Sequence, residues 1–198
     1  MTKAERTRQH IIQKVASVFN RQGYAGTALS DIEVACGLTK GAIYGHFGNK
    51  DALAIACFDH NIAPLQKGLI RALSSTGNSH DKLKASIRFY REHFDEVASK
   101  GGCPLMNTSI EADDTLPFLK ERVQQSISNW QEELVALIGR GKAEGCIETK
   151  VDAAQFATSM IGMIEGGILL AKAMDNALYF HQVINQLEEL IEKDIRRK

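Results

Sequence analysis

The sequence has few of the residues that would indicate a disulfide framework or a metal centre. Its 198 residues include four cysteines, three prolines and one tryptophan, and the formal net charge is zero. No two cysteines form a C-x-x-C pair, and no cysteine spacing indicates zinc. We therefore predict free thiols, no metal site and no cofactor, in a composition that is otherwise ordinary for a soluble globular protein.

Signals for export, membrane insertion and catalysis are missing as well. The first ten residues, MTKAERTRQH, are charged, and the most apolar run, residues 156–171, contains Glu165 and is short for a bilayer span. Reduced cysteines without an export signal predict a cytoplasmic protein with no membrane helix. The sequence also lacks G-x-S-x-G, H-E-x-x-H and G-x-x-x-x-G-K-S/T, so we predict that it is not an enzyme.

Charge is unevenly distributed although the total is neutral. Residues 1–50 hold seven Lys/Arg and three Asp/Glu, which leaves 17 basic and 21 acidic residues in the rest of the chain. A basic N-terminal part on an acidic body fits a surface that binds phosphates. The alternative is a chance asymmetry.

Apolar residues recur at helical spacing along almost the whole chain, and no segment has a convincing strand pattern or repeat. The predicted fold is all-α, with a three-helix head at 1–47 and a larger helical bundle at 48–198. The fourth helix belongs to both parts and would connect them. The expected helices cover residues 5–22, 30–36, 40–46, 50–74, 81–98, 104–112, 116–144, 152–174 and 178–196.

Residues 27–53, TALSDIEVACGLTKGAIYGHFGNKDAL, have the layout of a helix-turn-helix, in which the second helix enters the major groove of DNA. Gly37 permits the positive φ of the tight turn, and Thr39 is the expected cap of the following helix. A small core is expected to support that helix from behind. Its members are Val15, Phe19, Ile32, Leu38, Ile43 and Phe47.

The residues expected to face outward from the third helix suit contact with DNA. Thr39 and Lys40 lie at its N-terminus, where backbone amides and the helix dipole favour phosphate. Gly41 and Ala42 have little or no side chain, so the helix can approach base edges closely.

The stretch GYAGTALSDIEVACGLTKGAIYGHFGNKDAL resembles the N-terminal pattern of the TetR family of one-component repressors along nearly its whole length. Two positions depart from that pattern. Ala28 replaces a commonly found threonine, which would remove one backbone contact, and Glu33 adds an acid that lies near DNA or points into solvent. The positions that agree best are Gly23, Tyr24, Thr27, Asp31, Ile32, Ala35, Gly37, Lys40, Gly41, Tyr44, His46, Phe47, Lys50 and Leu53.

This resemblance implies a set of DNA-binding residues. Phosphate contacts are implied for Thr27, Tyr44, His46 and Lys50, and base or backbone contacts for Ser30, Thr39, Lys40, Gly41 and Ala42. Each assignment has an alternative. Tyr44 could pack on the core of the head, His46 could cap a helix end, and the lysines could be solvated charges.

The last two helices are the expected homodimer interface. Three glycines in one helix, Gly162, Gly166 and Gly167, need a packing reason, because each costs roughly 1 kcal/mol relative to alanine. Leu187 and Leu190 recur at helical spacing in the final helix. The resemblance implies that these two helices form a four-helix bundle between subunits, whereas the alternative is a core within one chain.

The resemblance also implies a small-molecule effector, bound inside the bundle. Methionines and aromatic rings form adaptable apolar walls, and Asn107 or Glu111 could orient a ligand. Plain core packing is the alternative at each position, and Cys103, placed before a proline, could also be a reactive thiolate. The candidates are Phe89, Tyr90, His93, Cys103, Met106, Asn107, Trp130, Met160 and Met163.

The sequence therefore predicts a ligand-responsive transcriptional regulator, most simply a repressor, that binds a near-palindromic operator in double-stranded DNA as a dimer. An effector would move the fourth helix and lower DNA affinity. The alternatives are a sequence-independent DNA-binding protein and, less favoured, an enzyme on a helical scaffold.

Overall fold

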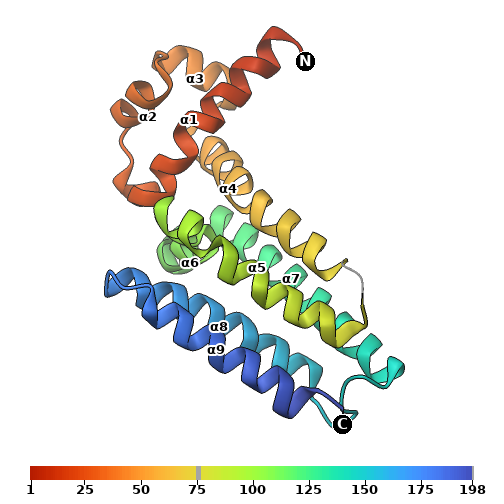
Figure 1. Cartoon of the computed structure of the whole chain (residues 1–198). Helices are drawn as coiled ribbons and strands as arrows, with labels where there is room; N and C mark the ends of the chain where they lie inside the picture. The colour runs from red at the N-terminus through yellow and green to blue at the C-terminus, as the bar shows by residue number, and fades with distance from the viewer. Residues whose placement is uncertain (75–76, 198) are drawn as a thin grey trace. The chain divides into compact units, whose positions relative to one another are not determined.

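The computed structural model describes residues 1–74 and 77–197 and is built from helices (Figure 1). No strand occurs in this part of the chain, where one antiparallel bridge joins Ile147 to Arg196. The all-α prediction is confirmed. The helices are α1 (Lys3–Gly26), α2 (Leu29–Cys36), α3 (Lys40–Phe47), α4 (Lys50–Leu73), α5 (Ser79–Ser99), α6 (Pro104–Thr115), α7 (Pro117–Glu144), α8 (Ala153–Ala173) and α9 (Leu178–Leu190), followed by a π-helical turn (Ile191–Ile195).

Most helix boundaries lie within three residues of the predicted ones, and two elements differ more. The first helix was expected to end at residue 22 because Gly23 follows. Gly23 does leave the helical region, with φ 76° and ψ 174°, but helical turns resume and α1 continues to Gly26. The last helix was expected to reach residue 196, whereas regular α9 stops at Leu190 and gives way to the π-helical turn.

The chain forms two compact units. The first contains Met1–Leu65 and Lys100–Gln124, and the second contains Gln66–Ser99 and Gln125–Lys198. These bounds differ from the expected domains, 1–47 and 48–198, because α6 packs against α1. The functional boundary near residue 47 stays a prediction.

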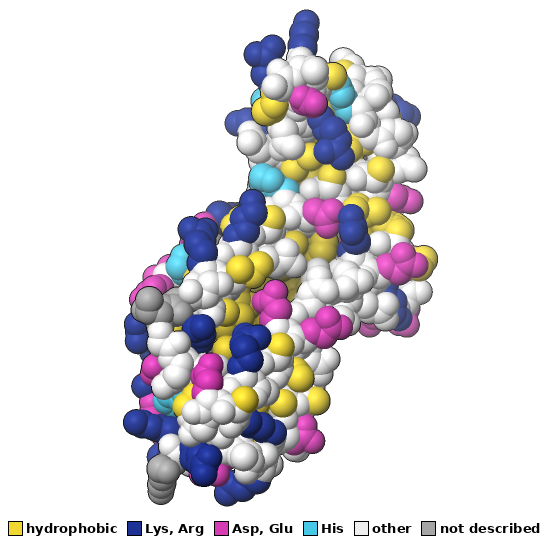
Figure 2. Space-filling view, turned by 90° about the vertical axis from the view of Figure 1, so that its right-hand side faces the viewer, with side chains coloured by type: hydrophobic (Ala, Val, Ile, Leu, Met, Phe, Trp, Pro, Cys, Tyr) yellow, Lys and Arg dark blue, Asp and Glu magenta, His cyan; other side chains and the backbone are white. Residues whose placement is uncertain are grey.

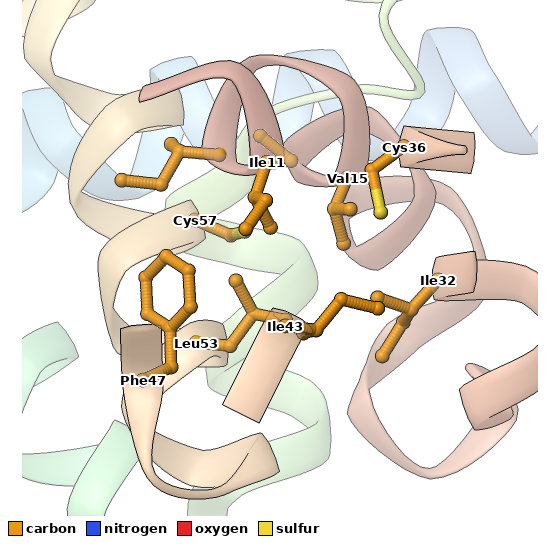
Figure 3. Close-up of a cluster of buried hydrophobic side chains, with 10 residues drawn as sticks. Ile11, Val15, Ile32, Cys36, Ile43, Phe47, Leu53 and Cys57 are labelled. Atoms are coloured by element: carbon orange, nitrogen blue, oxygen red, sulfur yellow. The ribbon is translucent and has the colours of Figure 1, made fainter. Parts of the chain in front are cut away.

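A buried apolar cluster holds the N-terminal helices together (Figure 3). Ile11 and Val15 of α1 meet Ile32 of α2 and Ile43 of α3, and none of these four side chains has measurable exposure. The Arg8 guanidinium lies 4.8 Å from the centroid of the Phe47 ring. Of the expected core, Val15, Ile32, Ile43 and Phe47 are buried, while Phe19 and Leu38 pack against the cluster from its edge.

In the second unit, α8 and α9 run side by side (Figure 1). A Cβ atom added at Gly167 would lie 3.2 Å from the Cβ of Val183, so glycine permits the close approach of these helices. Phe180 of α9 is fully buried and stacks on Phe94 of α5, with 4.2 Å between ring centroids. The three helices thus share one core.

One helix in the described residues, α8, is long and apolar enough to cross a membrane. Its 21 residues include an 18-residue window with a mean hydropathy of 1.3. Core helices of soluble proteins meet the same criterion, so the finding is weak evidence for a span.

Candidate nucleic-acid interface

The turn between α2 and α3 has the geometry of a helix-turn-helix. Gly37 ends α2 in the left-handed region, with φ 68° and ψ 25°, and its N–H donates to the Glu33 carbonyl at 2.8 Å. Only glycine takes this conformation without a steric penalty. Two residues later α3 begins at Lys40.

The cap of α3 is not the residue that we expected. The Thr39 side chain makes no capping hydrogen bond. Instead, the Lys40 backbone N–H donates to Oε1 of Glu33 at 2.6 Å. Glu33 therefore reaches across the turn and places its negative charge at the N-terminus of α3. From the sequence, this acid was expected near DNA or in solvent, and this capping role was not predicted.

One face of α3 is buried and the opposite face is open. Ile43 and Phe47 point into the apolar cluster, with exposures of 0% and 8%. Five predicted DNA-contact residues of this region are exposed: Ser30, Thr39, Lys40, Gly41 and Ala42. These five are the residues for which base or backbone contacts were expected; Ser30 lies on α2, and the other four lie at the start of α3.

The four residues expected to contact phosphate differ in accessibility. Tyr44 and His46 are half-buried, and Tyr44 packs against the apolar cluster, as its alternative reading proposed. Thr27 is fully buried, and its hydroxyl donates to the Gly23 carbonyl at 2.6 Å. The hydroxyl therefore bonds within the bend that leads into α2, and the phosphate contact of Thr27 stays a prediction.

Lys50 is half-buried and bonded within the protein. Its ammonium donates to the Tyr24 carbonyl at 2.6 Å and lies 4.2 Å from the centroid of the Tyr24 ring. An ammonium has three N–H groups, so this bond leaves donors for a phosphate. The phosphate contact of Lys50 stays a prediction.

Tyr24 is a further functional candidate. It lies in the N-terminal pattern matched from the sequence, but no role was predicted for it. Its hydroxyl donates a short hydrogen bond to Oδ1 of Asp51, at the start of α4. Burial, followed by this carboxylate, raises the pKa of Tyr24 to about 12. The sequence did contain a signal for this residue, because Gly23 and Tyr24 belong to the matched N-terminal pattern. That pattern does not show what the Tyr24 ring contacts.

Basic side chains are exposed near this motif. Lys3, Arg6, Arg8 and Lys14 of α1 are all accessible. Figure 2 shows Lys and Arg side chains at the upper end of the molecule, where α1 to α3 lie in Figure 1. This placement fits the predicted phosphate-binding end.

Comparisons with known proteins agree with this geometry. Residues 11–57 match the family model described as bacterial regulatory proteins, tetR family, and residues 79–187 match the model described as tetracyclin repressor-like, C-terminal domain. The chain belongs to the TetR family. It is thus a DNA-binding transcriptional regulator with a helix-turn-helix.

Individual TetR-family relatives match along most of the chain. The HTH-type transcriptional repressor DhaR of Mycobacterium sp. (strain GP1) is 27% identical, covering 85% of this chain and 84% of that protein. The crystal structure of a TetR transcriptional regulator from Chloroflexus aurantiacus J-10-FL has a TM-score of 0.94 and 36% identity, with full coverage of both chains. A TetR-family regulator from Cytophaga hutchinsonii has a TM-score of 0.91 and 38% identity, covering 100% of this chain and 98% of that one.

The TetR-family body separates the expected ligand residues into two groups. Cys103, Met106 and Asn107 lie in the first unit, where Cys103 is 3% exposed and the Asn107 amide donates to the carbonyls of Asn20 and Gly101. These bonds are structural, and they account for Asn107 without a ligand. The remaining candidates lie in the second unit: Phe89, Tyr90, His93, Trp130, Met160 and Met163.

Four of the candidates in the second unit form an aromatic group. Tyr90 stacks on Trp130 with 5.5 Å between centroids, and Phe89 lies 5.4 Å from Tyr90 and 4.3 Å from His93. Met160 is fully buried and Met163 is half-buried. An open cleft of about 360 Å³ in the same unit includes only Phe89 and His93 of the candidates. Its lining is Gly68, Arg71, Ala72, Ala85, Arg88, Phe89, Glu92 and His93.

The expected dimer residues are also divided by the structure. Gly167 and Leu187 are buried within the chain, and Gly167 lies where α8 closely approaches α9. Their part in a subunit interface stays a prediction. Gly162 is exposed, Gly166 is half-buried, and a Cβ at either would meet nothing within 4 Å. Leu190 is half-buried.

No group of three or more His, Cys, Asp or Glu side chains among the described residues could hold a metal ion. The four cysteines are free thiols, and Cys36, Cys57 and Cys103 are buried.

Proposed function

We propose that this TetR-family protein is a ligand-responsive repressor that binds a near-palindromic operator as a homodimer and releases it when a small-molecule effector binds. The observation that carries the proposal is the exposed face of α3, with Lys40, Gly41 and Ala42 accessible behind a Gly37 turn. Its curated relative DhaR is described as a repressor, which supports repression as the direction of control.

The roles of the DNA-facing residues follow from their positions. Gly41 and Ala42 let α3 approach base edges, and Lys40 neutralises a phosphate. Tyr44 and His46 would reach phosphates with the polar tips of half-buried rings. The hydroxyls of Ser30 and Thr39 are exposed, and both can donate hydrogen bonds to the DNA backbone.

A second copy of the chain supplies the second reading helix. One head makes few contacts, and helix-turn-helix dimers read half-sites about one helical turn apart. The exposed apolar side chains Leu169 and Leu170 of α8, at 44% and 46% exposure, favour this helix as the interface. Gly162 and Gly166 lie open on the same helix and would admit a close neighbour.

The effector is inferred to contact Trp130. The Nε1 atom of this tryptophan is buried and has no hydrogen-bond partner among the described residues. A buried indole N–H usually finds an acceptor. We therefore propose an effector with an apolar body and a hydrogen-bond acceptor, bound beside the Tyr90–Trp130 stack. The protein would act in the cytoplasm, where the DNA is.

Selection from a random duplex library would test the DNA-binding part of the proposal. Enriched duplexes should contain two related half-sites. Lys40→Ala should then weaken binding to selected and random duplexes alike and reduce the slope of log affinity against log salt by about one unit.

Lys150→Ala is the matched control, because Lys150 is an exposed lysine of the second unit. It should leave both affinity and slope unchanged. Failure to enrich any duplex, or equal affinity for enriched and random DNA at fixed salt, would contradict the proposal.

The sole tryptophan gives a direct readout for the effector. Apolar compounds with an acceptor group should change Trp130 fluorescence, and those that do should also lower affinity for the selected duplex. A compound that releases DNA and still binds Trp130→Phe with unchanged affinity, measured by calorimetry, would place the effector elsewhere.

A further inference from the structure

Several elements of the first unit converge on one tyrosine. The Tyr24 ring lies 5.5 Å from Phe118 of α7, its hydroxyl bonds Asp51, and its carbonyl accepts from Lys50 of α4. Its backbone N–H donates to Oε2 of Glu111 on α6 at 2.6 Å. A single residue at the bend of α1 thus contacts α4, α6 and α7.

Glu111 holds this bend with both carboxylate oxygens. Oε2 accepts from the Tyr24 N–H and Oε1 from the Ala25 N–H, each at 2.6 Å. The carboxylate also fills the space beside Gly23, where an added Cβ would lie 2.7 Å from Oε2. Gly23 therefore serves both the positive φ of the bend and the close approach of the carboxylate.

A second polar contact fixes the turn that precedes the bend. The Asn20 amide donates to the carbonyls of Lys100 and Gly102, at 2.9 and 3.1 Å. Asn107 of α6 returns a bond to the Asn20 carbonyl at 3.0 Å. The end of α1 is thus tied to residues 100–111 on both sides of Gly23.

The connectivity of the chain shows which elements lead from the second unit to these contacts. The backbone passes between the two units after Leu65, after Ser99 and after Gln124. In the first unit those three crossings belong to α4, to the segment leading into α6, and to α7. The helices α4 and α7 contact Tyr24, and the segment leading into α6 accepts from the Asn20 amide. On the other side, the Thr27 hydroxyl bonds the Gly23 carbonyl, and α2 begins two residues later.

We propose that Glu111 is a positioning residue for DNA reading. Its carboxylate holds the bend at Gly23–Ala25 so that α2 and α3 are presented in the orientation that fits the operator, and displacement of α6 releases it. This inference rests on the proposed function. It assigns to one carboxylate the link through which the rest of the chain controls the reading helix.

Three variants test the link. Glu111→Ala removes both acceptors, and Glu111→Gln retains one oxygen for one of the two N–H groups. Glu121→Gln is the matched control, because Glu121 is an exposed glutamate on α7 in the same unit. Each is titrated with the duplex selected above and with a random duplex, and the active fraction is measured by stoichiometric titration.

The expected readout is the ratio of the two affinities. Glu111→Ala should reduce the ratio of selected to random affinity about tenfold. If the orientation that fits the operator is populated about one tenth of the time, the apparent affinity for the selected duplex falls by that factor. Glu111→Gln should lie between it and the native chain, and Glu121→Gln should match the native chain. Loss of folding would lower the active fraction for both duplexes equally and leave the ratio unchanged.

Hydrogen exchange separates this inference from the proposed function. The Tyr24 and Ala25 amides should lose protection in Glu111→Ala and keep it in Glu121→Gln, whether or not DNA binds. An unchanged affinity ratio in Glu111→Ala, or unchanged exchange at these amides, overturns the positioning role. A native chain that selects no duplex overturns the proposed function itself, and this inference with it.

Discussion

At the scale of single residues, the cap of α3 shows how one carboxylate replaces the side chain that local pattern favours. Thr39 has the extended backbone of an N-cap, with φ −75° and ψ 158°, but its hydroxyl makes no cap bond. Glu33, six residues before it, accepts from the Lys40 N–H. The acceptor is ionised, so the bond is stronger than one to a neutral hydroxyl.

We therefore expect Glu33→Ala to lower the free energy of unfolding by about 1 kcal/mol, the usual effect of losing a cap. Thr39→Ala should change it by only a few tenths, because no cap bond is lost. Urea denaturation of both variants measures the difference. A larger loss for Thr39→Ala than for Glu33→Ala would show that the hydroxyl is the working cap.

Tyr24 should also make stability depend on alkaline pH. Its folded pKa is about 12, above the ordinary value of 10.0. Between those values the unfolded chain releases the Tyr24 proton while the folded chain keeps it, so the contribution is fully present below pH 10 and is lost as pH rises towards 12.

The measurement is urea denaturation at a series of pH values from about 9 to 11.5. Tyr24→Phe should show a shallower decline than the native chain, since its ring has no proton to release. Tyr179→Phe, on α9, is the control. An identical decline in the native and Tyr24→Phe proteins would contradict the prediction.

At the scale of helices, two glycines of α7 should respond to alanine in opposite directions. A Cβ at Gly139 would meet nothing within 4 Å, whereas a Cβ at Gly141 would lie 2.4 Å from Cδ1 of the buried Ile147. Gly139→Ala should raise the free energy of unfolding by up to about 1 kcal/mol through helix propensity. Gly141→Ala should lower it by about 1–3 kcal/mol through overpacking.

Thermal and urea unfolding of this pair give the test, with each variant as the control for the other. The two sites share a helix and differ in what lies beside them. Stabilisation by both substitutions would mean that Ile147 moves aside without cost.

At the scale of the whole molecule, the outward face of α8 should control assembly. Leu170→Glu places a charge among the exposed apolar residues of that helix and should convert the proposed dimer to a monomer in sedimentation velocity. Ile110→Glu is the matched control, because Ile110 is 64% exposed on α6.

The monomer should also lose affinity for the selected duplex, because it reads one half-site at a time. A Leu170→Glu protein that sediments as the native chain does would exclude this face as the interface.

Local sequence patterns were sufficient to predict the helix-turn-helix. The apolar period of α2 and α3 and the glycine between them, Gly37, identified the motif. In the structure Asn49 caps α4 by accepting from the Ala52 N–H at 2.8 Å. These features depend on residues within one or two helical turns of each other. Local physics is enough to specify them.

The same patterns did not separate core from interface. Gly167 and Leu187 have the small-residue and leucine spacing of an interface, and both are buried within one chain. Likewise, Asn107 has the chemistry of a ligand contact and bonds the backbone instead. Periodicity identifies a packed face without identifying what packs on it.

The amino-acid sequence by itself determined the helical class and the turn that sets α3, because short-range hydrogen bonds and apolar spacing encode them. The family followed from the resemblance of residues 23–53 to a known pattern. Only the tertiary structure decided that Glu33 caps α3, that Thr27 is buried, and that Glu111 grips the bend at Gly23. Glu111 is 87 residues from Tyr24 along the chain. No local rule connects two such positions, and folding brings the carboxylate to the amides that it accepts from.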